Sequence, residues 1–299
     1  MSRPLHIAVA QYEIGYHANL DAYEAKLTRW VADATAQGAQ LLVFPEYGAM
    51  ELASLFKQEI QRDLEAQLAA LQPLLPDYLA LHRRLAARHE VYLCAASFPV
   101  RAATGEYLNR AHLFSPRGAV GHQDKQTMTR FERERWGISP GCGLKVFDTA
   151  LGLLAVNLCY DAELPLLARA QVEAGAELLL VPSCTDSLAG YHRVRIACQA
   201  RALEGQYYVV QAPTVGDAAW SEAIDTNVGA AGVFAPPDLG FPEDGVIALG
   251  QINRPQWVHA ELDLERVAGV RTRGRVLGYQ DWPQQARAVG LPVERTPLD

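Results

Sequence analysis

Short apolar runs alternate along the chain with longer segments in which apolar residues recur at helical spacing. Residues 5–11 and 41–44 are apolar enough for buried strands. Between them, residues 20–37 have a helical pattern that ends at Gly38, a favourable helix C-cap. The alternation continues, and it predicts helices at residues 51–71, 77–88, 163–174 and 189–204 and strands at residues 91–97, 153–158, 178–181, 207–211, 229–234, 246–250 and 258–262.

The centre of the chain has a different pattern. Residues 107–114 and 120–125 flank Ser115-Pro116-Arg117-Gly118, a strong turn signal, so this stretch predicts a β-hairpin. A polar loop over residues 126–143 follows, and residues 144–147 are expected to pair with residues 153–158. Hairpins mixed with strand–helix crossovers favour an α/β protein with mixed sheets. We expect one domain over residues 1–277 and a tail over residues 278–299 that drapes over a neighbouring surface.

Charge and hydropathy exclude two classes of partner. The formal net charge is −7, and phosphate backbones repel an acidic surface, so no nucleic-acid partner is expected. The basic run over residues 266–275 is interpreted as a solvated loop. No run of about 18 apolar residues occurs, so no membrane span is predicted. The first residues lack an apolar signal region, and we expect a cytoplasmic protein.

The five cysteines form neither a disulfide framework nor a zinc motif in the sequence. Their number is odd and no Cys-x-x-Cys spacing occurs, so we expect thiols and no bound metal. Cys94 is expected in the core, Cys142 at the surface and Cys198 on a helix, while Cys184 lies close in sequence to the expected pocket.

Three predicted strands end at residues suited to nucleophilic chemistry. Glu46, Lys125 and Cys159 each stand at or just after the end of an apolar or hairpin strand. In α/β sheets, sites assemble at the carboxyl ends of strands. Taken singly, each residue has an ordinary interpretation: a solvated glutamate, a surface lysine or a small buried cysteine. The surrounding sequences distinguish these alternatives.

The segments Phe44-Pro-Glu-Tyr-Gly48, His122-Gln-Asp-Lys125 and Asn157-Leu-Cys-Tyr-Asp-Ala-Glu-Leu-Pro165 resemble the catalytic segments of the nitrilase superfamily, in the same order. Val181-Pro-Ser-Cys-Thr-Asp186 and Ala200-Arg-Ala-Leu-Glu204 are similar to two further family segments, so the resemblance covers residues 4–265. It points to the amidase-like branch and, within it, to the nitrilase-like half of certain acetyltransferase fusions. It implies a four-layer α-β-β-α sandwich with two mixed β-sheets.

The resemblance also implies a role for each reactive residue. Cys159 corresponds to the nucleophile, Glu46 to the general base and acid, and Lys125 to the cation that stabilises the oxyanion, together with the backbone N–H of Tyr160. The family's second glutamate corresponds to Glu132, seven residues after Lys125. Glu134 is the alternative, although a loop ion pair with a neighbouring arginine is the simpler interpretation of Glu134.

The resemblance places the substrate pocket in the loops around these residues. Its candidate lining residues are Tyr47, Arg130, Trp136, Thr185, Tyr191 and Arg193. Two arginines in this set suggest a substrate that carries a carboxylate.

The favoured function is cofactor-independent hydrolysis of a small amide through a thioester on Cys159. The alternatives are a nitrilase, an N-carbamoyl amide hydrolase and an inactive scaffolding relative. A homodimer or larger homo-oligomer is expected, paired through the helices that follow Cys159 and Asp186.

Overall fold

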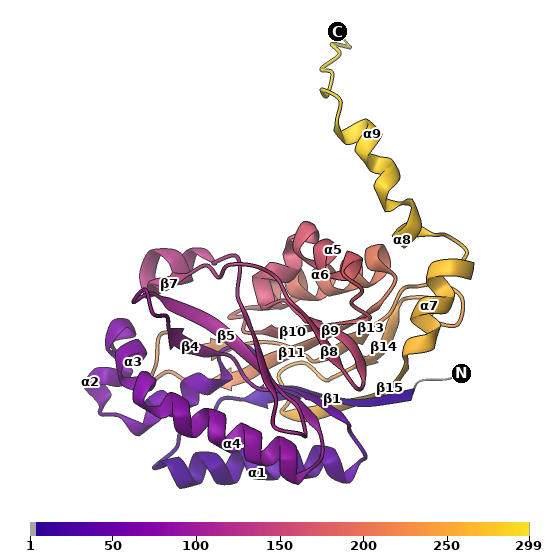
Figure 1. Cartoon of the computed structure of the whole chain (residues 1–299). Helices are drawn as coiled ribbons and strands as arrows, with labels where there is room; N and C mark the ends of the chain where they lie inside the picture. Colours follow the sequence, from indigo (N-terminus) through magenta and orange to yellow (C-terminus); the bar gives the residue numbers. More distant parts are fainter. Residues whose placement is uncertain (1–3, 299) are drawn as a thin grey trace.

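The computed structural model describes residues 4–298, and its strands form one continuous 15-stranded sheet with helices on its outer faces (Figure 1). The two halves of this sheet, the first sheet and the second sheet, are joined by pairing of β1 with β11. In the first sheet, β1, β2 and β3 are parallel, whereas β15, β4 and β6 run antiparallel to their neighbours. Its strands, in spatial order, are β4 (Phe98–Arg101), β5 (Tyr107–Phe114), β3 (Tyr92–Cys94), β2 (Leu41–Val43), β1 (Pro4–Glu13) and β15 (Gln256–Asp263), and β6 (Val120–Asp124) and β7 (Ile138–Ser139) also pair with β5.

The second sheet has a parallel centre formed by β9, β10 and β11, with antiparallel strands on either side. It meets the first sheet where the end of β1 pairs with β11, at Tyr12 and Thr214. Its strands are β8 (Val146–Thr149), β9 (Gly152–Val156), β10 (Leu178–Ser183), β11 (Tyr208–Asp217), β13 (Gly232–Phe234) and β14 (Val246–Leu249), and β12 (Thr226–Asn227) pairs with the end of β11.

Strand periodicity divides the core into two layers. Along β1, Leu5, Ile7 and Val9 pack into the cluster that contains the second sheet. Ala8 and Tyr12 point the other way, toward α1 (Leu20–Ala36) and α4 (Leu75–Arg88). The second sheet is covered by α5 (Pro165–Glu173) and α6 (Leu188–Gly205), as Figure 1 shows. The mixed α/β class is confirmed, and this layering is consistent with the expected α-β-β-α order.

The helix expected over residues 51–71 is wrong, because this stretch forms three short helices. They are the 3₁₀ helix η1 (Gly48–Leu55), α2 (Gln58–Gln61) and α3 (Leu64–Leu71). Phe56 and Lys57 have extended backbones, which end the first helix. Asp63 then starts α3, because its side chain accepts hydrogen bonds from two backbone N–H groups of the first turn. The short 3₁₀ helix η2 (Gln72–Leu74) links α3 to α4.

The basic run over residues 266–275 is also not a solvated loop. It lies mostly in α7 (Leu264–Arg273), which is capped by the side chain of Asp263 and buries Val267 and Val270. Arg271 turns inward, and its guanidinium donates hydrogen bonds to the carbonyl oxygens of Ala176 and Gly205. Helical spacing of the apolar residues therefore determined the structure here, rather than the charge density.

The tail follows the chain's own surface only at its beginning. It forms α8 (Gly278–Asp281), the 3₁₀ helix η5 (Trp282–Gln285) and α9 (Ala286–Val289). The rings of Tyr279 and Trp282 lie against the guanidinium of Arg169. Beyond them the tail projects from the body of the molecule, drawn in yellow in Figure 1, and Val293 is exposed. Only the beginning of the tail, around Tyr279 and Trp282, therefore packs on the rest of the chain.

Candidate active site

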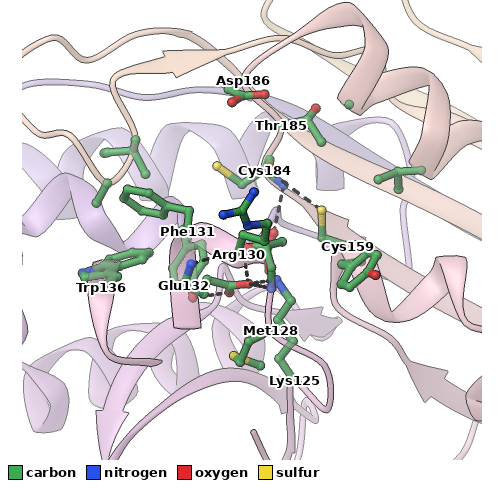
Figure 2. Close-up of a pocket in the computed structure, with 18 of the residues that line it drawn as sticks. Lys125, Met128, Arg130, Phe131, Glu132, Trp136, Cys159, Cys184, Thr185 and Asp186 are labelled. Carbon is green, nitrogen blue, oxygen red and sulfur yellow. Dashed lines mark hydrogen bonds and ion pairs between the residues drawn. The ribbon is translucent and has the colours of Figure 1, made fainter. Parts of the chain in front are cut away.

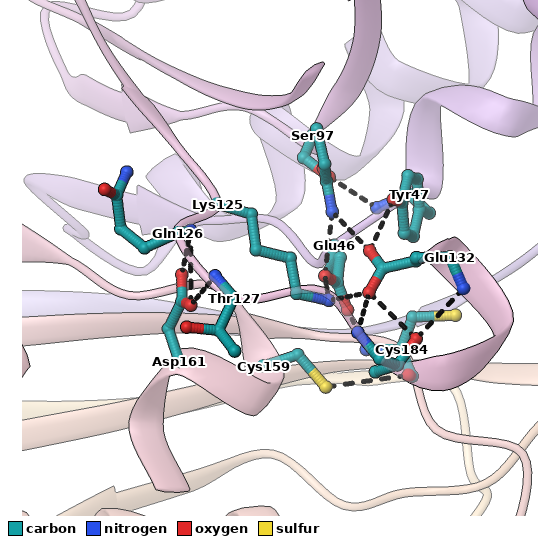
Figure 3. A network of polar contacts seen from close by, with 12 residues as sticks. Glu46, Tyr47, Ser97, Lys125, Gln126, Thr127, Glu132, Cys159, Asp161 and Cys184 are labelled. Carbon is teal, nitrogen blue, oxygen red and sulfur yellow. Dashed lines mark hydrogen bonds and ion pairs between the residues drawn. The ribbon is translucent and has the colours of Figure 1, made fainter. Parts of the chain in front are cut away.

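Loops that follow strand ends bring the predicted reactive side chains together (Figure 3). Glu46 follows β2, and Lys125 comes directly after β6. Cys159 begins the short 3₁₀ helix η4 (Cys159–Glu163) after β9. Glu132 begins η3 (Glu132–Trp136), a π-helical turn inside the stretch predicted as a polar loop. Three segments that are distant in sequence, at Glu46, residues 125–132 and Cys159, therefore converge at one site.

Lys125 joins the two glutamates. Its Nζ lies 2.9 Å from Glu46 Oε1 and 2.7 Å from Glu132 Oε2, and all three side chains are buried. An ammonium group has three N–H donors, and these two contacts use two of them. One donor of Lys125 is therefore available for a bound substrate.

Glu132, rather than Glu134, is the second glutamate of this cluster. Its carboxylate accepts hydrogen bonds from Tyr47 Oη at 2.6 Å and from the backbone and hydroxyl of Thr129 at 2.8 and 2.9 Å. Glu134 instead forms an exposed ion pair with Arg130, which is the simpler interpretation given to it from the sequence. The π-helical turn buries Glu132 and exposes Glu134, so Glu132 is the glutamate that joins the cluster.

The carboxylate of Glu46 is held from three directions. Oε1 accepts from Lys125 and, at 2.8 Å, from Asn109 Nδ2, while Oε2 accepts from the backbone N–H of Cys184 at 3.1 Å. Burial raises the pKa of Glu46 to about 7; the positive charge of Lys125 opposes this rise, and the negative charge of Glu132 adds to it. Near neutral pH this carboxylate can therefore both take up and release a proton.

For Lys125 and Glu132, neighbouring charges shift the pKa more strongly than burial does, and in the opposite direction. Burial would lower the pKa of Lys125, but the adjacent carboxylates of Glu132 and Glu46 outweigh it and hold this pKa above its ordinary value. Burial would raise the pKa of Glu132, but Lys125 and the donated hydrogen bonds keep this pKa low. Lys125 is thus a fixed cation and Glu132 a fixed anion, whereas Glu46 is the titrating member.

Cys159 has an unusual backbone for a non-glycine residue. Its φ of 48° lies in the left-handed region, which costs about 1–3 kcal/mol and is retained mainly at functional sites. Burial, together with the negative charge of Glu46, raises the pKa of its thiol well above the usual range. The resting sulfur is therefore protonated, and its proton has to move to a base as the sulfur attacks.

Asp161 ties the nucleophile turn to the lysine loop. Its buried carboxylate accepts from the backbone N–H of Gln126 at 3.0 Å and of Thr127 at 2.8 Å (Figure 3). These residues directly follow Lys125, so the contact fixes the distance between the lysine and Cys159.

Glu46, Lys125, Glu132 and Cys159 line a pocket of about 650 Å³ (Figure 2). The binding residues proposed from the sequence that line it are Tyr47, Arg130, Trp136, Tyr160, Thr185 and Arg193. The predicted substrate-binding role of Tyr191 is not supported, because Tyr191 does not line the pocket.

Along α6 the pocket is lined by Gly190, Arg193 and Val194. Tyr191 is buried outside the pocket, with its ring against that of His192.

The arginines around the pocket are already paired with carboxylates. Arg130 forms two hydrogen bonds with Glu134, and Arg133 approaches the same carboxylate. Arg193 lies 3.5 Å from Glu163. The suggestion that these arginines bind a substrate carboxylate is therefore weakened, since a substrate would have to displace an existing partner.

Sequence reasoning missed several residues of the site. Asn109 contacts Glu46 and lies in the middle of β5, where its only signal is a polar residue in a predicted hairpin strand. Met128 and Phe131 lie in the stretch interpreted as polar loop, and residues 222–226 reach the pocket from the loop before and into β12. No local pattern connects these residues to Cys159, because only tertiary packing brings them near it.

The structure shows neither a metal site nor a membrane-spanning helix within residues 4–298. Over that range no group of three or more histidine, cysteine, aspartate or glutamate side chains could hold a metal ion. Within the same residues no helix is both long enough and apolar enough to cross a membrane.

A model of the carbon–nitrogen hydrolase family matches residues 6–251. The chain is 34% identical over 278 residues to the probable hydrolase YhcX of Bacillus subtilis, covering 93% of this chain but only 53% of that protein. This chain therefore spans about half the length of that relative. It is also 26% identical to omega-amidase NIT2-B of Xenopus laevis, over 64% of this chain and 68% of that protein.

Solved structures share the fold at lower identity. A carbon–nitrogen hydrolase from Helicobacter pylori G27 superposes with a TM-score of 0.74 at 21% identity, covering 94% of each chain. A variant of the amidase from Nesterenkonia sp. AN1, covering 97% of each chain, superposes with a TM-score of 0.71 at 21% identity. That structure shows covalent addition of the acetamide moiety of fluoroacetamide at its active-site cysteine.

Proposed function

Because the chain belongs to the carbon–nitrogen hydrolase family, we propose that it hydrolyses a small non-peptide amide to a carboxylic acid and ammonia. The observation that carries the proposal is the Lys125–Glu46 contact of 2.9 Å in the wall of the pocket that Cys159 also lines. A titrating carboxylate, a fixed cation and a thiol are the groups that acyl transfer through a thioester requires. Relatives named as amidases support this proposal, and relatives named as nitrilases make a nitrile the alternative substrate.

The first half of the reaction forms the thioester. The Cys159 sulfur attacks the amide carbonyl while its proton passes to Glu46. Lys125 and the backbone N–H of Tyr160 stabilise the oxyanion of the tetrahedral intermediate. Glu46 then gives its proton to the amide nitrogen, and the C–N bond breaks to release ammonia. The carboxylate of Glu46 is now ionised again.

The second half cleaves the thioester. Glu46 takes a proton from a water molecule as that water attacks the thioester carbonyl. The same oxyanion contacts stabilise the second tetrahedral intermediate. Collapse breaks the C–S bond, the acid leaves, and the proton on Glu46 returns to the sulfur. Glu132 positions Lys125 through its 2.7 Å contact and takes no proton.

The test is turnover in the presence of hydroxylamine, with mass spectrometry of quenched enzyme. An acyl adduct on Cys159 and a hydroxamate product are the expected results, because hydroxylamine competes with water for the thioester. The substrate series is pentanamide, glutaramic acid, an N-carbamoyl amino acid and pentanenitrile. Consumption of the nitrile alone would refute the amidase proposal, and no turnover or adduct with any of them would favour an inactive scaffold.

The same series tests which amides bind. The three arginines that line the pocket already have carboxylate partners. We therefore expect pentanamide to be hydrolysed at least as well as glutaramic acid, which has a carboxylate at the same chain length. A strong preference for glutaramic acid would show that a substrate displaces Glu134 or Glu163.

We further infer a homodimer that packs α5 and α6 of one copy against those of another. Apolar side chains on these two helices are exposed by half or more, and contiguous exposed apolar surface marks an association site. They are Leu166, Leu188, Ile196 and Leu203. Light scattering at micromolar concentration should give about twice the 32.8 kDa mass of one chain, and a monomer would contradict the inference.

A further inference from the structure

Asn109 lies beneath the candidate active site and reaches two of its carboxylates. Its Nδ2 is 2.8 Å from Glu46 Oε1 and 3.5 Å from Glu132 Oε1. The side chain is fully buried and does not line the pocket, so it cannot touch a substrate. Whatever Asn109 contributes to the reaction therefore passes through the two glutamates.

The contacts of Glu46 indicate which of its two carboxylate oxygens can exchange a proton. A carboxylate offers about four lone-pair positions, two on each oxygen. Lys125 Nζ lies 2.9 Å from Oε1, Asn109 donates a hydrogen bond to the same oxygen, and the backbone N–H of Cys184 donates one to Oε2. Oε1 therefore has two donors in contact with it and Oε2 has one, and Glu46 lines the same pocket as the Cys159 thiol.

We propose that Asn109 is a positioning residue that saturates Oε1 of Glu46 and so makes Oε2 the atom that carries the proton between Cys159 and the leaving nitrogen. The inference rests on the proposed amide hydrolysis. Each cycle remains balanced: the proton that Oε2 takes from the thiol goes to the departing amine, and the proton that Oε2 takes from water returns to the sulfur.

The backbone of Asn109 also contacts the lysine segment of the site. Its carbonyl oxygen accepts the N–H of Lys125 at 2.9 Å. One residue of β5 therefore holds both the lysine and the carboxylate that the lysine contacts. Because β5 is paired with β4 and with β6, this residue is fixed on two sides and cannot follow small movements of the Glu46 loop.

The other amide atom of Asn109 supports a functional role. Its Oδ1 is buried and makes no hydrogen bond within the described part of the chain. A buried acceptor left without a donor is unfavourable, so an apolar residue would suit this position better if packing were the only requirement. Donation to the two glutamates is what an apolar side chain would lose.

The ionisable groups around Glu46 determine the direction of the expected pH effect. Lys125 contributes a positive charge, Glu132 a negative charge, and Cys159, Cys184 and Tyr47 are neutral thiols and a neutral phenol whose raised pKa values keep them protonated. A donor such as Asn109 favours the ionised carboxylate. Its removal should therefore raise the pKa of Glu46 and move the acid limb of kcat/KM to higher pH.

The test compares the pH profile of kcat/KM for wild type, Asn109→Ala and Asn109→Asp. We expect kcat/KM at pH 7 to fall about 10- to 100-fold in Asn109→Ala, since a hydrogen bond to a charged group is lost. The midpoint of the acid limb should rise. It should rise further in Asn109→Asp, which keeps the shape but adds a carboxyl group beside Glu46 and Glu132.

Ser97→Ala is the matched control. Its buried hydroxyl accepts the backbone N–H of Tyr47 at 2.8 Å, so it holds the same loop without touching a carboxylate. Loosening the loop can lower the rate, but the midpoint of the acid limb should not move. An unchanged midpoint in both Asn109 variants would overturn the proposal, and should Asn109→Ala fail to fold, Asn109→Asp still gives the result.

A second measurement separates this proposal from the proposed function. The rate of Cys159 alkylation by iodoacetamide needs only transfer of the thiol proton and attack, and no amide turnover. If the wild type hydrolyses no amide but the alkylation midpoint still rises in the Asn109 variants, the function is wrong and the role of Asn109 stands. If amides are hydrolysed and neither midpoint moves, the function stands and the role of Asn109 is refuted.

Discussion

Two buried glutamates, Glu46 and Glu51, stand five positions apart on one segment, and each contacts a lysine. Both oxygens of Glu51 are fully used: Oε1 accepts from Gly15 and Lys26, and Oε2 accepts from Tyr12 and His17. This cluster joins η1 to the start of α1 and lines none of the pocket that contains Cys159. Glu46 has three such contacts, one fewer than Glu51, and it lines that pocket.

The lysines that contact these glutamates, Lys26 and Lys125, differ in the direction of their pKa shifts. Lys26 has a single carboxylate partner, and burial lowers its pKa even though Glu51 opposes the change. Lys125 lies between two carboxylates, which outweigh burial and raise its pKa. Burial of a charged pair therefore does not identify a catalytic site. An incompletely hydrogen-bonded carboxylate, a cation fixed by a second anion and access to a cavity together distinguish the reactive cluster from the structural one.

Removal of the sulfur should have the largest effect on activity. Cys159→Ala should lower kcat by about 10⁴-fold or more, because no other group replaces a covalent nucleophile. Cys159→Gly should be equally inactive but more stable than Cys159→Ala by about 1 kcal/mol, because glycine accepts the positive φ at this position. Kinetics and thermal denaturation of both variants test this, and substantial turnover by either would exclude Cys159 as the nucleophile.

The matched pair Glu46→Gln and Glu51→Gln tests the contrast directly. Glu46→Gln should lower kcat about 10²- to 10⁴-fold, because the general base is lost. Glu51→Gln should instead lower the free energy of unfolding by about 3 kcal/mol, because it leaves Lys26 without its charged partner. Its kcat per folded molecule should change little. The reverse distribution of effects would mean that Glu51 belongs to the chemistry.

The second pair is Glu132→Gln and Glu134→Gln. Glu132→Gln should lower kcat/KM about 100-fold, because Lys125 loses one of its two buried carboxylates and its position with it. Glu134→Gln removes only exposed ion pairs with Arg130 and Arg133, which contribute less than about 1 kcal/mol. A larger loss in Glu134→Gln than in Glu132→Gln would contradict the arrangement of this loop.

The smallest effect is the pH dependence of the wild type. Free enzyme is active when Glu46 is ionised and can take the thiol proton. Since burial raises its pKa to about 7, kcat/KM should be constant well above pH 7 and fall about tenfold for each unit below it. A midpoint near 4.5 would mean that Glu46 is solvated, as an ordinary glutamate is.

The amino-acid sequence by itself determined the family, the class of fold and the identities of Cys159, Lys125 and Glu46 as the candidate reactive residues. Apolar periodicity, which is set by local geometry, indicated the class of fold. The family and the reactive residues came from three short segments that resemble the family's catalytic segments in the same order. The same resemblance favoured Glu132, seven residues after Lys125, over Glu134, although it did not exclude Glu134.

Tertiary structure decided what depends on contacts between distant segments. Asn109 is 63 positions from Glu46, and no periodicity relates the two residues. The position of Tyr191 outside the pocket, the break of the helix after Leu55 and the pairing of the pocket arginines likewise follow from packing. The number of contacts that each carboxylate makes distinguishes Glu46 from Glu51. This number depends on the three-dimensional surroundings, so it has no signature in the sequence.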